Sequence, residues 1–267
     1  MKNLLNIACG GRYHKDWINI DFHAESNHVT KVNILGGLPL SDNSMDVVYS
    51  SHFLEHLSQD QANFVLKESY RILNKDGIIR IVVPDLEDVC KEYLRVLGMV
   101  SQNKKYEEEY QWITVELLDQ LVRVNGGGKM GEIFSHIAST KNKKLADYVL
   151  IRTGDDLLKE NQTKQRKITF DKVKNKLLYL YLKVVRLLIP KNLRDLIFVN
   201  TSVGEKHQWM YDRYSLTKKL SDLGFKNIEI KTFNESNIDN FNNYLLDIKD
   251  DGTPYKGASS LYIEAKK

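Results

Sequence analysis

The sequence has little of what cross-links a chain. It contains two cysteines, Cys9 and Cys90, and four prolines in 267 residues. Two cysteines provide neither a disulfide framework nor the thiolates of a zinc site. Cys9 lies in a glycine-rich turn, where we expect a small packed side chain rather than a nucleophile. The first apolar strand begins almost at once, so we expect no signal peptide and a cytoplasmic protein.

An excess of one charge is also missing. The formal net charge is +4, with 42% hydrophobic and 28% charged residues. This composition is typical of a globular protein, and the charge is too small to indicate a nucleic-acid partner by itself. The length suits one large domain or one domain with an insertion.

Two short apolar runs near the start end in residues suited to a ligand. The run 4–9 ends in Gly10 and Gly11, and the run 17–20 ends in Asp21. In a parallel sheet the carboxyl ends of neighbouring strands face a ligand crevice. Glycine lets a ligand approach the main chain closely, and an acid can accept both hydroxyls of a ribose. The pattern predicts a nucleoside-containing cofactor.

A dinucleotide is excluded by what the turn lacks. The dinucleotide fingerprint needs a third glycine and an acid about 20 residues further on. Residues 9–14 lack that glycine, and Asp21 follows Gly11 by only ten positions. No helix of normal length fits between the two strands, so a pyrophosphate would have no helix N-terminus. A cofactor with ribose and adenine but no phosphate fits better.

Three ordered blocks, at 6–11, 38–57 and 68–85, resemble the motifs of class I S-adenosylmethionine-dependent methyltransferases. The absent first helix makes the chain similar to a subgroup associated with bacterial surface-polysaccharide biosynthesis. The resemblance covers about residues 3–90 and 204–267. It departs from the family pattern at Asn6 and Asn33, where acids are common, although asparagine also donates and accepts hydrogen bonds.

The resemblance implies S-adenosylmethionine as cofactor and a set of residues that bind it. These residues are Cys9, Gly10, Gly11, Asp21, Phe22, Asn33, Ile34, Leu35, Ser51 and His52.

The resemblance implies a doubly wound, Rossmann-like α/β sheet closed by an antiparallel hairpin, and the hydrophobic pattern is consistent with its strands and helices. Strands are expected near 4–8, 17–21, 30–34, 46–50, 78–83, 225–232 and 259–266, and helices near 59–73, 86–97 and 214–223. We divide the chain into a first part of the core (1–97), a helical insertion that forms an acceptor or cap region (98–200), and a closing part of the core (201–267).

The acceptor is expected to meet the insertion and the segment that follows it. Glu116, Asp119, Gln120 and Arg123 share one face of a predicted helix, which is either a solvated face or a polar wall over the cofactor. The segment 204–212 places histidine and aromatic residues before the last helix. The residues predicted to contact the substrate are Asp85, Asp119, Arg123, His207 and Tyr211.

Two histidines are candidates for the general base. His52 follows the fourth strand, and His207 lies before the last helix; an imidazole with an ordinary pKa near 6.5 can take a proton from a hydroxyl. Glu55 and His56 resemble a pair that binds metal in some relatives. Two ligands are fewer than a usual site supplies, so we expect no metal.

A basic segment stands out at 164–194, with ten cations and one acid. Its apolar part, 177–189, is too short to cross a bilayer. It suits an amphipathic helix at an anionic membrane surface, or a core-packed helix whose cations face water.

We therefore expect a methyltransferase that O-methylates a glycan or a lipid-linked glycan precursor. RNA or small-metabolite methylation is the alternative, as is a methyltransferase-like scaffold that binds without turnover. RNA ranks lower because no aromatic-basic pattern of an RNA module is present. The sequence leaves the oligomeric state open.

Overall fold

The computed structural model describes residues 2–24, 26–123, 126–159, 180–181, 184–185 and 206–267. The basic segment 164–194 lies outside these residues except at 180–181 and 184–185, so its membrane contact stays a prediction. None of the helices in the described ranges has the length and apolar character that a bilayer crossing needs.

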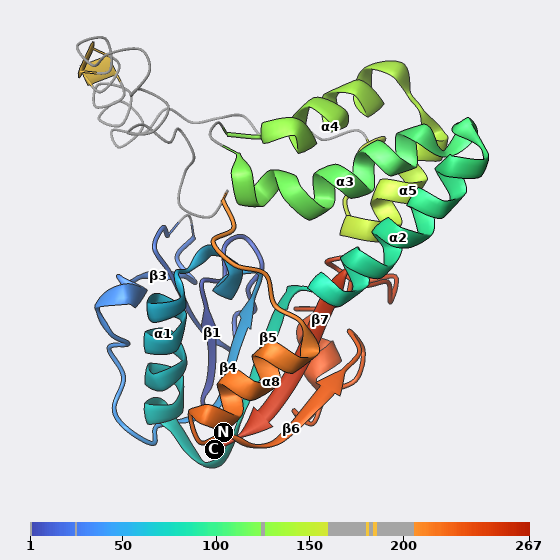
Figure 1. Ribbon diagram of the computed structural model, residues 1–267. Coiled ribbons are helices and arrows are strands. Elements are labelled where there is room, and N and C mark those ends of the chain that lie inside the picture. The colour runs from blue at the N-terminus through green and yellow to red at the C-terminus, as the bar shows by residue number, and fades with distance from the viewer. Residues whose placement is uncertain (1, 25, 124–125, 160–179, 182–183, 186–205) are drawn as a thin grey trace.

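Seven strands form one sheet in the order β3-β2-β1-β4-β5-β7-β6 (Figure 1). All neighbours are parallel except β7, which runs antiparallel to both β5 and β6. This arrangement confirms the predicted fold class. The strands are β1 (Leu4–Ile7), β2 (Ile18–Asp21), β3 (Thr30–Lys31), β4 (Met45–Ser51), β5 (Leu73–Pro84), β6 (Lys226–Lys231) and β7 (Ser260–Lys266).

Two strands differ from their predicted bounds by more than one residue at an end. The third ends at Lys31, and a 3₁₀ helix (Ile34–Gly36) follows where the strand was expected to continue. The fifth begins at Leu73 rather than at 78, because Leu73 already pairs with Met45 of β4. Both differences concern boundaries and leave the strand order unchanged.

The link between β1 and β2 is as short as the sequence predicts. Residues 8–17, all of which are described, contain no helix. Asn6 and Asn19 face each other across the two strands, and the Asn6 Nδ2 donates to the Asn19 Oδ1 at 3.2 Å. Both side chains are buried, so this pair fixes the register that brings the strand ends together.

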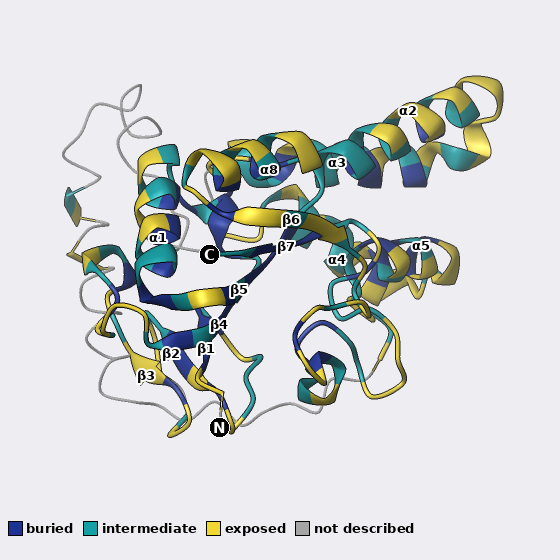
Figure 2. Ribbon diagram, turned by 90° about the horizontal axis from the view of Figure 1, so that it is seen from below, coloured by how far each residue is buried: buried dark blue, intermediate teal, exposed yellow. Residues whose placement is uncertain are grey.

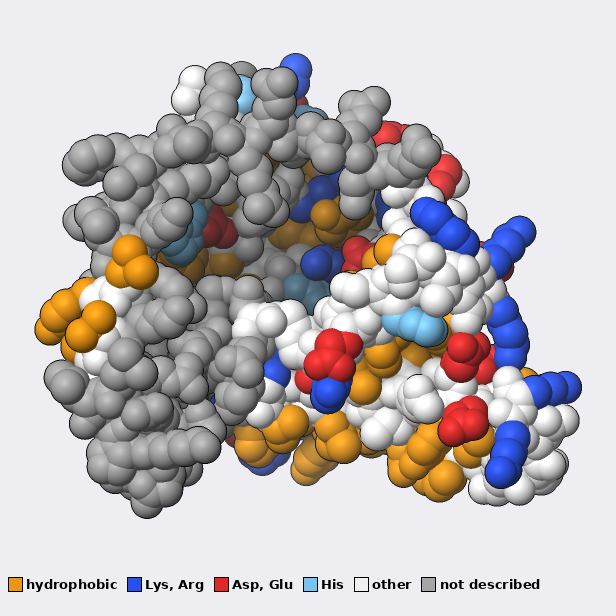
Figure 3. All heavy atoms as spheres, turned by 90° about the horizontal axis from the view of Figure 1, so that it is seen from above, with side chains coloured by type: hydrophobic (Ala, Val, Ile, Leu, Met, Phe, Trp, Pro, Cys, Tyr) orange, Lys and Arg blue, Asp and Glu red, His pale blue; other side chains and the backbone are white. Residues whose placement is uncertain are grey.

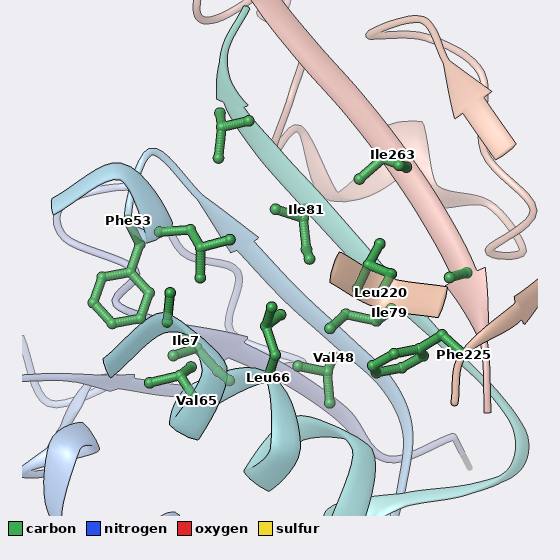
Figure 4. Close-up of a cluster of buried hydrophobic side chains, with 14 of the residues drawn as sticks. Ile7, Val48, Phe53, Val65, Leu66, Ile79, Ile81, Leu220, Phe225 and Ile263 are labelled. Carbon is green, nitrogen blue, oxygen red and sulfur yellow. The ribbon is translucent and has the colours of Figure 1, made fainter. Parts of the chain in front are cut away.

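Helices α1 (Gln59–Ile72) and α8 (Arg213–Asp222) cover one face of the sheet (Figures 1 and 2). Ser58 begins α1 with a capping box, as its sequence suggests, and Asp212 begins α8 in the same way. Apolar side chains of both helices meet those of the strands in one buried cluster (Figure 4). Ten of its members are labelled there: Ile7, Val48, Phe53, Val65, Leu66, Ile79, Ile81, Leu220, Phe225 and Ile263.

The other face is covered by the long connection between β6 and β7. Phe241 of its 3₁₀ helix (Phe241–Tyr244), and Leu246 just after that helix, join Trp17 and Tyr49 in one buried cluster. No helix leaves the β1–β2 link to cover this face, so the connection fills the space.

Arg80 of β5 anchors this connection from beneath. Its side chain is fully buried and donates to Asp247 Oδ2 and Glu264 Oε1, each at 2.7 Å. It also donates to the carbonyls of Thr232 and Glu235. A buried cation with all of these partners holds the start and the middle of the connection on the sheet.

The insertion contains α2 (Leu86–Gln102), α3 (Glu107–Val122), α4 (Gly128–Thr140) and α5 (Lys143–Thr153) (Figure 1). Trp112 of α3 is fully buried and stacks on Phe134 of α4, with ring centroids 5.5 Å apart. The predicted boundary at 97/98 falls inside α2, and the division into domains stays a prediction.

The insertion joins the core where α5 ends. The Ala258 amide donates to the Ile151 carbonyl at 2.8 Å, and the Ser259 hydroxyl donates to the Arg152 carbonyl at 2.6 Å. Gly154 and Gly257 meet at this seam with positive φ angles of 79° and 70°. A Cβ on Gly257 would lie 2.4 Å from the Arg152 carbonyl oxygen, so the two backbones approach as closely as glycine allows.

Candidate active site

A first cavity, of about 180 Å³, opens at the carboxyl end of β1. Positive φ angles at Ala8 and Gly10, of 53° and 52°, turn the chain sharply after the strand. Apart from its chain neighbours, no atom of the described residues lies within 4 Å of where a Cβ of Gly10 or Gly11 would stand. The cavity is lined by Asn6, Ala8, Cys9, Gly10, Gly11, Arg12, Tyr49, Ser51, His52, Leu246, Tyr255 and Lys256.

Asp21 stands at the tip of β2 beside this turn. Its Oδ2 accepts from the Gly10 amide and its Oδ1 from the His23 amide, each at 2.9 Å. Each carboxylate oxygen has a second lone pair, so the group can still accept two hydroxyls. Burial, followed by the charge of Asp21, raises the pKa of Cys9 to about 12. Its thiol is therefore neutral at pH 7, which agrees with a packing role.

The remaining predicted cofactor residues lie beyond the cavity, around the tips of β2 and β3. The rings of Phe22 and Phe53 lie 6.3 Å apart. Ile34 is fully buried, Leu35 packs against the same core, and Asn33 precedes their 3₁₀ helix. Of the predicted set, Cys9, Gly10, Gly11, Ser51 and His52 line the cavity; Asp21, Phe22, Asn33, Ile34 and Leu35 do not. The binding roles themselves stay predictions.

Sequence reasoning missed the residues that close this cavity from the β6–β7 connection. The Arg12 guanidinium lies 4.2 Å from the centre of the Tyr255 ring and donates to the Ile248 carbonyl at 2.6 Å. Lys256 lines the cavity beside them. These partners lie more than 230 positions from Arg12 in a connection without periodicity, so no local signal marks them.

A second cavity, of about 340 Å³, lies next to the first, between the sheet and the insertion. Figure 3 shows this side of the molecule as hollowed, with basic, acidic and histidine side chains in the hollow. His52 and Lys256 line both cavities. The second is lined by His52, Glu55, His56, Pro84, Val89, Glu116, Gln120, Met130, Thr153, Asp155, His207, Met210, Lys256 and Ser259.

His52 lies where the two cavities meet. Its φ of 50° is unusual for a residue other than glycine, and its amide donates to the Val82 carbonyl at 2.9 Å. The Nε2 lies 3.0 Å from Ser260 Oγ, and the Nδ1 lies 3.5 Å from Glu55 Oε1. Burial, followed by the charge of Lys256, lowers the pKa of His52 well below 6.5. The ring is therefore neutral at pH 7.

Glu55, His56 and His207 form a buried cluster in the wall of the second cavity. Their candidate ligand atoms all lie within 4.8 Å of one another. Glu55 is fully buried, and burial raises its pKa to about 8. His207 is also buried, and burial followed by His56 and Arg123 lowers its pKa to about 3.

Main-chain hydrogen bonds bring these three residues together. The amides of Gln208 and Trp209 both donate to the Glu55 carbonyl, at 2.8 and 3.2 Å. The His207 amide donates to the Gln120 carbonyl of α3 at 2.9 Å. The segment before α8 is thus hydrogen-bonded to both the core and the insertion. These bonds place His207 beside Glu55 and His56, which lie about 150 positions earlier in the sequence.

The predicted substrate residues of the insertion hold two helices together. Asp119 pairs with Arg123 at 2.5 Å and accepts from the Lys129 amide of α4 at 2.8 Å. Neither side chain lines the cavity, although Glu116 and Gln120 of the same helix do. Asp119 thus supplies the cap that the first turn of α4 needs.

Asp85 and Tyr211 lie side by side behind the second cavity without lining it. Asp85 begins α2 by accepting from the Glu87 amide at 3.0 Å, and it forms a bridge with Tyr211. Burial raises the pKa of Asp85 and raises that of Tyr211 to about 12. Of the five predicted substrate residues, His207 alone lines the cavity; the substrate roles stay predictions.

Comparison with known proteins locates the first cavity in a known kind of domain. Residues 5–81 match the family model described as a methyltransferase domain. No curated protein matches the chain.

Solved structures with similar chains include two methyltransferases. A SAM-dependent methyltransferase from Archaeoglobus fulgidus is 14% identical, with 100% of this chain and 86% of that one aligned and a TM-score of 0.41. A SAM-dependent methyltransferase from Thermotoga maritima, described as a possible histamine N-methyltransferase, is 11% identical, with 100% and 83% aligned and a TM-score of 0.40. Both scores lie below 0.5, so the assignment rests on the sequence match and the strand order.

The strand order and the family match define a class I methyltransferase domain. Residues 5–81 thus belong to a methyltransferase domain, whose cofactor is S-adenosylmethionine, and the first cavity has the features that this cofactor needs. Open space lies above Gly10 and Gly11, and Asp21 keeps two free acceptor positions. The buried Ser51 Oγ, which lines the cavity, has no partner among the described residues.

Proposed function

We propose that the protein O-methylates a sugar hydroxyl of a glycan or of a lipid-linked glycan precursor. One observation carries the proposal: a polar cavity adjoins the cofactor cavity and shares His52 and Lys256 with it. Its volume of about 340 Å³ falls in the usual range for small-ligand sites. Carboxyl, amide, imidazole and ammonium groups face it together, as a polyhydroxylated acceptor requires.

His52 is the residue that we assign as the base. When bound, S-adenosylmethionine supplies an electrophilic methyl group on a sulfonium. His52 lines both cavities, so an acceptor hydroxyl that points from the second cavity toward the first lies next to its imidazole. The Nε2 of His52 accepts the proton. The Ser260 hydroxyl, whose oxygen lies 3.0 Å from Nε2, can donate instead to the Lys256 carbonyl oxygen at 3.5 Å. Glu55 lies on the Nδ1 side of the ring, with its Oε1 3.5 Å from Nδ1.

His207 remains the second candidate for the base. It lines the acceptor cavity but not the cofactor cavity. A proton acceptor must reach the hydroxyl while that hydroxyl attacks the methyl group, and this favours His52.

Methyl transfer to a panel of acceptors tests the function. Purified protein and cofactor carrying a labelled methyl group are incubated with nucleotide sugars, lipid-linked oligosaccharides, total RNA and small amines. We expect label in a sugar fraction, as an alkali-stable methyl ether. Label only in RNA or in an amine would overturn the glycan assignment, and bound cofactor with no transfer to any acceptor would favour the scaffold.

The base assignment has its own test in the same assay. His52→Gln should lower turnover by about 10²–10⁴-fold while cofactor binding persists. His136→Gln, at an exposed position of α4, serves as the matched control and should keep full rate. Full activity of His52→Gln together with loss in His207→Gln would transfer the role to His207.

The proposal also includes contact of residues 164–194 with anionic lipid, which rests on the sequence alone. Co-sedimentation with anionic vesicles at low salt, and release at high salt, is the expected result. A protein that stays in the supernatant under both conditions would leave the lipid-linked acceptor without this support.

A further inference from the structure

A buried carboxyl group with no hydrogen-bond donor among the described residues lies in the wall of the second cavity, which we propose for the acceptor. Glu55 is 0% exposed, and neither of its oxygens has a hydrogen-bond donor among the described residues. Burying such a group without compensation is costly. Every other buried acid of the core reported above is paired or caps a helix, so Glu55 needs an explanation of its own.

Two imidazoles face this carboxylate. The His56 Nε2 lies 3.8 Å from Glu55 Oε1, and His207 lies against His56 with ring centroids 4.9 Å apart. One candidate ligand atom from each of the three residues lies within 4.8 Å of the others. All three residues line the same cavity.

The tautomer of His56 is fixed in the form that a metal ligand needs. Its Nδ1 lies 3.1 Å from the Lys206 carbonyl oxygen, which can only accept. The proton is therefore on Nδ1, and Nε2 keeps its lone pair on the side of Glu55. Metal-binding histidines commonly donate their other nitrogen to a carbonyl in this way.

We propose that Glu55, His56 and His207 bind a divalent first-row transition metal ion. Two imidazoles and one carboxylate suit zinc, iron and their neighbours better than magnesium or calcium, which prefer oxygen ligands. With metal–ligand bonds of about 2.1 Å, tetrahedral ligand atoms stand about 3.4 Å apart. Small rotations of these side chains therefore suffice to close the site.

The site also gives the metal a place in the reaction. Three protein ligands leave coordination positions open, as in catalytic rather than structural sites, and the three residues face the acceptor cavity. An acceptor hydroxyl bound there would be held within reach of His52, which lies 3.5 Å from Glu55. This last step rests on the proposed function; the metal site itself does not.

Metal binding is measured on the full chain without cofactor or acceptor. Protein freed of metal with a chelator is titrated with Co²⁺, whose visible absorption reports coordination, and with Zn²⁺ in a thermal-denaturation assay. We expect one equivalent of metal, visible bands from nitrogen coordination and a rise in Tm. The variants Glu55→Gln and His207→Ala should bind at least about tenfold more weakly, and His136→Ala should bind like the original protein.

Folding of the variants does not obscure this result. Glu55→Gln keeps the size of the side chain and removes an unpaired buried carboxyl group, so without metal it should be at least as stable as the original. A folded original protein that binds neither Co²⁺ nor Zn²⁺ would overturn the inference. Equal binding by the original protein and Glu55→Gln would overturn it too.

The outcomes separate the metal site from the proposed function. Sugar methylation by chelator-treated protein that binds no metal would reject the site and leave the function. Tight metal binding with no transfer to any sugar would reject the function and leave the site.

Discussion

The two cavities share a wall, but the chain builds them in different ways. The cofactor side depends mainly on the ends of β1, β2 and β4, which lie within the first 52 residues. The second cavity, which we propose for the acceptor, combines residues that follow β4, the middle of α3, the segment before α8 and the β6–β7 connection. The first cavity is mainly a local feature of a parallel sheet, to which the connection adds one wall, whereas the second exists only after distant segments have met.

The largest effect should come from the group that holds the connection on the sheet. Arg80→Met leaves Asp247 and Glu264 buried without their cation, and removing one partner of a buried ion pair costs about 3–5 kcal/mol. Urea denaturation should show this loss, and cofactor affinity should fall with it because the connection closes the first cavity. Arg95→Met removes an exposed partner of Glu92 and should change stability by less than about 1 kcal/mol.

If Arg80→Met keeps its stability, the connection is held by its apolar contacts rather than by this network. The first cavity would then depend less on Arg80 and more on the ends of the strands than we describe.

The seam between insertion and core should show the next largest effect. Gly257→Ala forces a left-handed residue, at about 1–2 kcal/mol, and drives a Cβ toward the Arg152 carbonyl, which adds about 1–3 kcal/mol. Gly252→Ala is the matched control, since its φ is 79° but no atom lies within 4 Å of the new Cβ. Thermal denaturation should therefore show a clearly larger loss for Gly257→Ala.

This pair of variants also tests how separate the two sides are. Gly257→Ala should impair methyl transfer more than cofactor binding, because the seam positions the insertion. Equal losses in the two glycine variants would mean that the backbones can move apart at little cost.

The smallest effect concerns an ion pair within α1. Glu68 accepts from Arg71 and from the Leu38 amide, and these bonds, the Arg71 bond first, lower the pKa of Glu68. A carboxyl whose folded pKa is depressed stabilises the protein above its unfolded pKa, and that stability is lost as the pH falls through the folded value. Glu68→Gln should cost less than about 1 kcal/mol at pH 7, and this cost should shrink as the pH is lowered toward about 2.

A stability difference between Glu68→Gln and the original protein that grows on acidification would contradict this sign. Urea denaturation at the two pH values measures it.

The contrast between the cavities also explains what the sequence can predict. The short link before Asp21 is encoded in a few adjacent residues, and it is found as predicted. Periodicity also found the polar face of α3. It did not predict which of these residues face the second cavity. Asp119 pairs with Arg123 and accepts a hydrogen bond from α4, whereas Glu116 and Gln120 line the cavity.

Other parts of the site had no local signal. Lys256 and Tyr255 belong to a connection whose position depends on Arg80 and on the α5 seam. Glu55 and His56 were visible as a pair, but the third member of the cluster, His207, meets them only through the fold. The sequence therefore identified these residues as candidates, but it did not predict that they form one cluster.

The most direct test of the account compares cofactor binding in two variants, one for each cavity. Asp21→Ala removes the acceptor at the tip of β2, and lost hydrogen bonds to a charged group cost about 1.5–3 kcal/mol, or roughly 10- to 150-fold in Kd. Gln120→Leu alters the acceptor cavity alone and should leave the Kd within about twofold. Calorimetry with S-adenosylmethionine gives both values. An unchanged Kd in folded Asp21→Ala, or an equal loss in Gln120→Leu, would contradict the division of the site into a cofactor side and an acceptor side.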